Sequence, residues 1–385
     1  MSSSPDALLR RRDEPLQASF LELFFDLAFV LALRQLSLVL LADVSVAGVA
    51  RTALLLLPLW SVWVVTAWFT DWYDRANPRV QALLIGTTLG VLLMSVAIPE
   101  ATGDRAGLFA GAYVALHLGR SIVTSVTLRG HALRRRTLRV LVWFGASGIF
   151  WLAGVVWPGV RLPAWTVAVA LDYAAAPLGW PTPGLGRAQP GELRLRGRHL
   201  TERFQQIFII ALGELIITAG LAFSAAGLGV AHSVAFLLAF AIAALTGRLY
   251  VTPAGRYLGA AIDERDPTRF GVLAGNLHLV MIAGVVATSV AADLVIAHPT
   301  ERAPGTAVAI TVAGPALFLA GRVGLSAVIY RRVSRPRLLG LPALAVIALA
   351  GPAMPLLGVA AATVAVLITV GILDGRSKRW EAAPE

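Results

Sequence analysis

Long apolar stretches separated by short polar segments run through the whole chain. Each is about 20 residues long, the length that an α-helix needs to cross the hydrocarbon core of a bilayer. The pattern predicts an all-α fold, a polytopic transmembrane helical bundle of about 12 spans. These spans lie at about residues 19–41, 48–70, 79–98, 106–128, 138–156, 159–178, 201–222, 229–251, 270–292, 304–330, 337–351 and 354–374. Pro163, Pro342 and Pro352 lie at or near the ends of the sixth and eleventh.

Composition supports a membrane protein. Only 14% of the 385 residues are charged and 57% are hydrophobic, whereas soluble proteins average about 25% charged residues. The formal net charge of +11 would indicate nucleic acid in a soluble protein, but here the arginines cluster between the apolar stretches. We expect a lipid bilayer and an unknown small solute or ion as partners, and no nucleic acid. The absence of cysteine excludes disulfides, thiolate metal sites and cysteine nucleophiles.

The arginines fall mainly on one side of the predicted membrane. The opposite side contains only Arg105 and Arg302 in its connecting segments, each beside a carboxylate. By the positive-inside rule, we expect a multi-pass protein of the cell's inner (plasma) membrane with cytoplasmic tails at 1–18 and 375–385. An odd number of spans would break this alternation. The arginine-rich segments are 71–78, 129–137, 179–200, 252–269 and 331–336.

The second half of the chain repeats parts of the first. Glu22 matches Glu202, and further along Gly119-Arg120 matches Gly321-Arg322 in the same order. The matches predict two repeats of six helices, and because six is even, both copies would have the same orientation in the membrane. The predicted regions are a first repeat at 19–178, a cytoplasmic linker at 179–200 and a second repeat at 201–374.

Charged residues lie within several predicted spans, where a charge is costly unless it is paired or hydrated. The first span contains Glu22 and Asp26, which are four residues apart and share a helix face. Arg120 in the fourth span lies near the same depth, so we expect it to meet one of these two carboxylates.

The repeat extends this pairing to the second half. Arg322 has the position of Arg120 and should meet Glu202. Arg34 and Glu214 occupy equivalent positions in the first and seventh spans, where they could form a gate or a lock between the halves.

Two interpretations of these charges stay open. In the structural one, the ion pairs only fix helix packing, and Glu22 and Asp26 stabilise a helix N-terminus. In the functional one, four carboxylates bind or couple an ion or substrate (Glu22, Asp26, Glu202 and Glu214), and three arginines pair with them or gate (Arg34, Arg120 and Arg322). His117 and His278 stand alone, and no His, Asp and Glu grouping has metal-site spacing, so we predict no metal and no cofactor.

Three sequence motifs resemble those of a known family. Leu21-Glu22-Leu23-Phe24-Phe25-Asp26 and the residues up to Val30 resemble the opening signature of the bacterial low-temperature-requirement protein A family. His199-Leu200-Thr201-Glu202-Arg203-Phe204, with Ile209 to Glu214, resembles its second signature, and Ala97 to Ala101 resembles a third. The resemblance implies a multi-pass inner-membrane protein linked to growth in the cold, without a settled biochemical activity. Arg34 stands where the family is expected to have a small or polar residue.

The functional prediction rests on the charged residues within the spans more than on any motif. We expect a secondary transporter, coupled to a proton or cation, with its path between the first and seventh spans. An ion channel or proton leak could use the same polar axis, and a membrane enzyme or lipid-handling protein is a further alternative. No nucleophile elbow, zinc-protease motif or phosphate loop occurs in the sequence, so we do not predict an enzyme.

Overall fold

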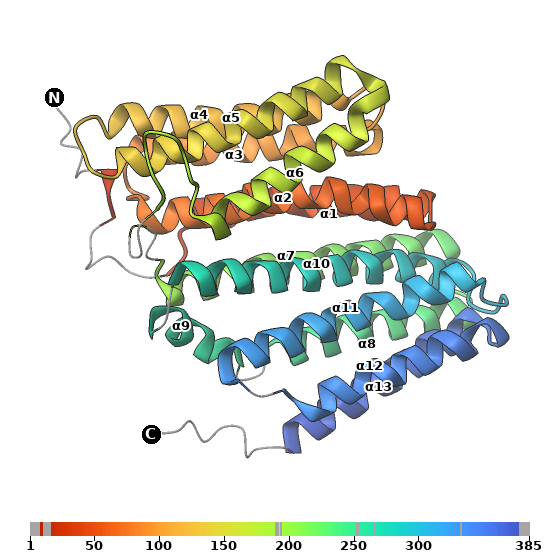
Figure 1. Cartoon of the computed structure of the whole chain (residues 1–385). Coiled ribbons are helices and arrows are strands. Elements are labelled where there is room, and N and C mark those ends of the chain that lie inside the picture. Colours follow the sequence, from red (N-terminus) through yellow and green to blue (C-terminus); the bar gives the residue numbers. More distant parts are fainter. Residues whose placement is uncertain are drawn as a thin grey trace. The chain divides into compact units, whose positions relative to one another are not determined.

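The computed structural model describes residues 8–10, 17–188, 192, 195–251, 254–264, 267–331 and 333–376, and only the backbone at 254–256, 267, 268 and 330. These residues form an all-helical protein in which no β-strand occurs within the described ranges (Figure 1). The helices are α1 (Phe20–Ala42), α2 (Val46–Trp72), α3 (Pro78–Ala97), α4 (Ala106–Thr127), α5 (Arg134–Val156), α6 (Arg161–Leu178), α7 (Gly197–Ala226), α8 (Val230–Val251), α9 (Ala254–Glu264), α10 (Pro267–Ala297), α11 (Gly305–Tyr330), α12 (Arg335–Ala350) and α13 (Leu356–Arg376).

Every one of the twelve predicted stretches forms a helix, and one more helix lies where the sequence predicted a connecting segment. This additional helix, α9, is only 11 residues long. It buries Leu258, Ala261 and Ile262, which are spaced as on one helix face, and exposes Glu264. A short amphipathic helix does not stand out in a hydropathy pattern, which is why the sequence did not reveal it.

Eleven of the described helices are long and apolar enough to cross a membrane. Of the twelve predicted spans, α6 is the one that is not among them. It has only 18 residues and contains Arg161 and Asp172, which lower its mean hydropathy. The prediction of a helical protein with many membrane spans is therefore confirmed, and eleven of the twelve spans are supported by length and composition.

The helices form two compact units, which we call the first and second unit. The first consists of Met1–Leu36, Ala50–Ile207 and Gly259–Gly275, and the second of Ser37–Val49, Phe208–Leu258 and Asn276–Glu385. The boundaries of these units are not those of the predicted repeats, because α1, α2, α7, α9 and α10 each contribute residues to both. The predicted tails at 1–18 and 375–385 and the predicted linker at 179–200 lie partly outside the described residues.

In the first unit, α3, α4, α5 and α6 pack in sequence order, each against the next (Figure 1). Aromatic side chains fill the space between α4, α5 and α6. Trp165 Nε1 donates a hydrogen bond to the backbone oxygen of Trp151 at 3.0 Å, and the Phe109 ring stacks on Trp165 with centroids 5.8 Å apart. Gly154 allows this approach, because a Cβ there would lie only 2.5 Å from Trp165 Nε1.

In the second unit, α11, α12 and α13 pack together and α8 packs on α13. The rings of Phe208 and Tyr250 stack with centroids 3.9 Å apart, and Phe318 lies 5.7 Å from Phe208. Helices α10 and α11 approach closely at Gly284 and Gly314. A Cβ at Gly314 would lie 2.9 Å from the backbone oxygen of Gly284, so this contact requires a glycine.

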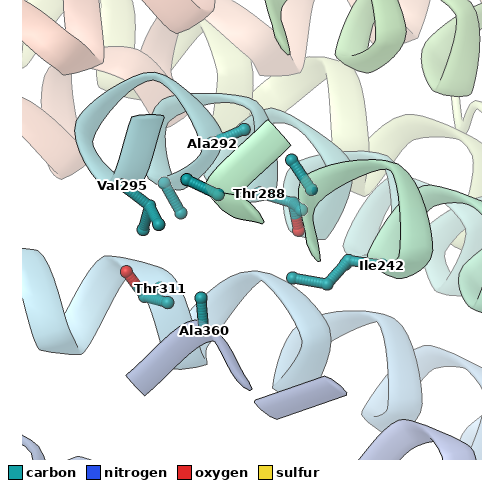
Figure 2. Close-up of a pocket in the computed structure, with 9 residues that line it drawn as sticks. Ile242, Thr288, Ala292, Val295, Thr311 and Ala360 are labelled. Carbon is teal, nitrogen blue, oxygen red and sulfur yellow. The ribbon is translucent and has the colours of Figure 1, made fainter. Parts of the chain in front are cut away.

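A small pocket in the second unit is lined from α8, α10, α11 and α13 (Figure 2). Its lining residues are mostly small and apolar: Ala235, Ala239, Ile242, Thr288, Ala291, Ala292, Val295, Thr311 and Ala360. The hydroxyls of Thr288 and Thr311 donate to backbone oxygens of their own helices at 2.8 and 2.7 Å. With a volume of about 10 Å³, which holds about one water molecule, this pocket is a packing void and not a solute site.

The close approach of α10 and α11 predicts a large difference between two glycine substitutions. Gly314→Ala forces a methyl group against backbone atoms of α10, 2.8 Å from Thr288 N, and overpacking of this kind costs about 1–3 kcal/mol. Gly371→Ala in α13 meets no atom within 4 Å and should leave stability unchanged or slightly higher. The thermal unfolding midpoint of each purified variant in detergent measures this difference. Equal midpoints for the two variants would contradict the close approach.

Candidate functional site

Two carboxylates occupy the first turns of α1, and neither is exposed to solvent. Glu22 and Asp26 are one turn apart and both have 0% of their surface accessible. Ser19, the residue before the helix, covers part of the Glu22 carboxylate. Ser19 donates from its backbone nitrogen and from its hydroxyl to Glu22 Oε2, at 2.7 and 3.0 Å. Ser19 and Glu22 thus form a capping box at the start of α1, so the capping interpretation holds for Glu22.

Asp26 is paired with an arginine from the first turns of α7. Arg203 donates two parallel hydrogen bonds to the Asp26 carboxylate, at 2.7 and 2.8 Å, and a third to Gln206 at 2.9 Å. Trp63 of α2 donates from its indole nitrogen to Asp26 Oδ1 at 2.9 Å. A buried bidentate pair of this kind is strong and has a fixed geometry. Asp26 is therefore held by three donor groups from two helices.

His199 lies one turn before Arg203 on α7 and between two carboxylates. Its Nε2 is 2.9 Å from Glu22 Oε1. Its Nδ1 is 3.1 Å from Oδ1 of Asp71, a distance typical of an ion pair, although the two groups are not aligned as a hydrogen bond. Asp71 also accepts a hydrogen bond from the backbone nitrogen of Arg196 at 2.9 Å. All these groups are buried.

Two further arginines lie at the edge of this group. Arg75 donates to Glu22 Oε2 at 2.8 Å and to the backbone oxygen of Gln17 at 2.6 Å. Its side chain is 12% exposed, whereas the side chains of Glu22 and Arg203 are fully buried. Arg10 Nη1 lies 3.8 Å from Asp71 Oδ1. Burial, with Arg75 and Arg196 nearby, lowers the pKa of Arg10. Arg75 is thus partly exposed to solvent, while the Glu22 carboxylate that it contacts is buried.

We call these side chains the acid–histidine cluster: Arg10, Glu22, Asp26, Asp71, Arg75, His199 and Arg203. All belong to the first unit. Its three carboxylates and three guanidinium groups balance in formal charge. His199 is the remaining ionisable side chain of the cluster.

The structure corrects the expected partner of Glu22 and Asp26. Arg120 does not contact them and the prediction of that pair was wrong. Arg120 instead donates to Thr66 at 2.9 Å and lies over the ring of Phe69, 5.8 Å from its centroid. Depth in the membrane was the basis of the prediction, but depth does not determine the direction in which a side chain leaves its helix. Arg203 holds the place that was expected for Arg120.

Glu202 and Glu214, the other two predicted carboxylates, lie on α7 outside the acid–histidine cluster. Glu202 accepts a hydrogen bond from the backbone nitrogen of Ala18 at 3.2 Å and lies 3.5 Å from Arg198. It is next to Arg203 in the helix and so faces a different side. Glu214 is fully buried in the second unit, where the hydroxyls of Thr218 and Ser289 donate to it at 2.8 and 2.6 Å.

Arg322 is buried in the second unit with its guanidinium over the ring of Tyr250, 5.6 Å from the centroid. The predicted pair of Arg322 with Glu202 and that of Arg34 with Glu214 each join residues of different units. Both pairs stay predictions, as do the coupling and gating roles of all seven predicted residues.

The sequence analysis gave no role to Trp63, which donates to Asp26, or to four members of the acid–histidine cluster: His199, Arg203, Asp71 and Arg75. The second motif contains both His199 and Arg203, and their spacing of four places them on one face of α7. That spacing was the available signal. Asp71 and Arg75 lie at the end of α2, where the sequence shows only a polar connecting segment. No group of three or more His, Asp or Glu side chains in the described part of the chain is arranged to hold a metal ion.

Comparisons with known proteins point to one family. Residues 17–372 match the family model described as bacterial low temperature requirement A protein (LtrA). An uncharacterized protein of Rhizobium meliloti is 30% identical over 375 residues, which cover 95% of this chain and 91% of that protein. No solved structure matches. The matched range includes Glu22, Asp26, His199 and Arg203.

The buried pair of Asp26 with Arg203 predicts strong coupling between two substitutions. Asp26→Asn or Arg203→Gln leaves one buried charge without its partner, which costs about 3–5 kcal/mol. The double variant should lose much less than the sum. The control is the pair of Glu100 with Arg105, whose side chains are 51% and 44% exposed and whose coupling should be about 0–1 kcal/mol. Unfolding titrations with denaturing detergent in mixed micelles measure both cycles, and additive effects at Asp26 and Arg203 would rule out the pair.

Proposed function

We propose that this chain, which belongs to the bacterial low temperature requirement A family, is a proton-coupled secondary transporter of the inner membrane. The proton resides on the acid–histidine cluster. His199 takes it up between Glu22 and Asp71, and Arg203 pairs with Asp26. The transported solute is small.

The observation that supports this proposal is the position of His199 between two carboxylates. A neutral imidazole has one donor nitrogen and one acceptor nitrogen. If Nε2 donates to Glu22, Nδ1 has no hydrogen and lies near an oxygen of Asp71. The two electron-rich atoms repel each other at 3.1 Å unless one more proton lies on the ring or on Asp71. The site is therefore built to hold an additional proton, and histidine is the side chain that gains and loses one near neutral pH.

Because the acid–histidine cluster is buried, a proton bound there affects the electrostatic energy of the first unit. Ionisable groups inside membrane spans are rare and mark proton relays and ion paths in transporters. Here the groups join the start of α1, the end of α2 and the start of α7, and the side chain of Arg75 is partly exposed to solvent. Protonation changes the net charge of the acid–histidine cluster by one, which changes the electrostatic energy of its present packing.

We also infer twelve spans arranged as two repeats of parallel orientation, with cytoplasmic termini. The support is a feature that the two units have in common. Arg120 lies over Phe69 at 5.8 Å in the first unit, and Arg322 lies over Tyr250 at 5.6 Å in the second. The residue four positions after each arginine, a threonine in α4 and a serine in α11, donates its hydroxyl to the arginine backbone oxygen, at 2.8 and 2.9 Å. The arginine, aromatic and hydroxyl residues follow the order of the repeat.

Proton movement in proteoliposomes tests the coupling. The lumen contains a pH-sensitive dye, and gradients of potassium salts of small anions, of inorganic cations and of neutral polyols are imposed in turn. One class should drive proton movement in the wild type, and His199→Gln should lower that movement at least about tenfold, because a general acid–base group contributes about 100-fold or more.

The matched control is His298→Gln. His298 also lies beside a carboxylate, Glu301 at 2.8 Å, but both side chains are more than half exposed. This variant should keep the wild-type rate. Undiminished proton movement in His199→Gln, or none in the wild type with any solute class, contradicts the proposed function.

Topology can be tested by single cysteines, because the chain has none of its own. A membrane-impermeant maleimide should label Gly103→Cys and Gly159→Cys in intact cells. Arg129→Cys and Arg187→Cys should react only after permeabilisation. Labelling of residues 159 and 187 from the same side would show that α6 does not cross the membrane, and labelling of Arg129→Cys in intact cells would invert the orientation.

A further inference from the structure

We propose that Arg120 is an anion-binding residue and that the solute that moves with the proton is a small anion, such as a halide, a small oxyanion or a short carboxylate. The inference rests on the proposed function, because it names the class of solute. It comes from a part of the first unit that the acid–histidine cluster does not include.

The guanidinium of Arg120 has no carboxylate partner. Its contacts are the hydroxyl of Thr66 at 2.9 Å, Nδ1 of His117 at 3.5 Å and the ring of Phe69. All three are neutral, and within the described residues Arg120 makes no ion pair. By contrast, Arg203, Arg75 and Arg139 each contact a carboxylate at less than 3.0 Å. A buried charge without a counter-charge is strongly destabilising, so the protein retains Arg120 at a cost.

Beside Arg120, His117 has an N–H group that lacks an acceptor, on the side of its ring away from the guanidinium. Because its Nδ1 faces a guanidinium nitrogen, which can only donate, Nδ1 is the acceptor and Nε2 has the hydrogen. Nε2 is buried and has no hydrogen-bond partner among the described groups. The imidazole is fixed by stacking on Phe144, with ring centroids 3.8 Å apart. A buried N–H group without an acceptor and a buried cation without an anion thus lie three residues apart on α4.

The charge and donor geometry of Arg120 favour an anion as its ligand. Arg120 is buried, with 6% of its surface accessible. Guanidinium groups bind halides, oxyanions and carboxylates through several parallel N–H donors. A neutral or cationic solute would leave the charge of Arg120 uncompensated, whereas an anion removes the cost of burying it.

Helix α2 connects this anion site to the acid–histidine cluster. Trp63 donates to Asp26, Asp71 lies against His199, and between them Thr66 contacts Arg120. The two sites also complement each other in charge. A proton on His199 adds one positive charge to the first unit, and an anion at Arg120 adds one negative charge. With both bound, the net charge of the unit is the same as with neither bound, so the two together cross the membrane without a net charge.

Thermal unfolding of the purified full-length protein in detergent tests the anion site without any transport. Potassium gluconate, whose anion is bulky, is replaced at constant ionic strength by potassium chloride, nitrate, formate or phosphate. At least one of these should raise the wild-type unfolding midpoint in a saturable way. Arg120→Gln should weaken the apparent affinity at least about tenfold. Arg129→Gln removes an exposed arginine just beyond the same helix and should keep the wild-type affinity.

Two results overturn the proposal: no saturable response to any of the four salts in the wild type, or an unchanged response in Arg120→Gln. If Arg120→Gln does not fold, Thr66→Val decides, because it keeps the charge and removes the hydroxyl that orients it. Its apparent affinity should fall several-fold, and an unchanged affinity overturns the proposal. His199→Gln should retain the anion response. An anion response in the wild type without proton movement would reject the proposed function and leave the anion site intact.

Discussion

The ion pair between Asp26 and Arg203 is the constraint on which the first unit depends. Two opposite charges without solvent contact are tolerated only when each satisfies the other and the remaining donors and acceptors find partners. Trp63 and Gln206 supply those partners, from α2 and from α7 itself. The positions of the first turns of α1 and α7 and of one face of α2 are therefore set together. His199 can face Glu22 and Asp71 only because this arrangement is fixed one turn away.

The sequence predicted the membrane helices well, because a run of about 20 apolar residues is a direct consequence of bilayer thickness. It also predicted that Glu22 and Asp26 share a helix face, since their spacing determines that. It did not predict their partner. Arg120 and Arg203 both lie at a suitable depth, and only the rotation of each helix about its axis distinguishes them. Asp71 and Arg75 were missed for a similar reason, because a polar connecting segment gives no sign that its side chains fold back into the protein.

The two sites of the first unit differ in how their charge is balanced. The acid–histidine cluster has a counter-charge for every guanidinium, and its one variable is the proton on His199. Arg120 has hydroxyl, imidazole and aromatic neighbours but no acid. Under the two proposals, the balanced site would take up a proton and the unbalanced site an anion, and both sites lie along α2. The family is named after a requirement for growth at low temperature. The two proposed sites allow one to ask whether movement of a proton and an anion underlies that requirement.

Glu22 belongs both to the capping box at the start of α1 and to the acid–histidine cluster. Glu22 Oε2 accepts from Ser19 and from Arg75, while Oε1 faces His199. Neutralising this one carboxyl weakens the fastening of the first turn of α1 and the anchor of the segment after α2 in the same event. The start of α1 and the segment that follows α2 are thus held by the same carboxyl group.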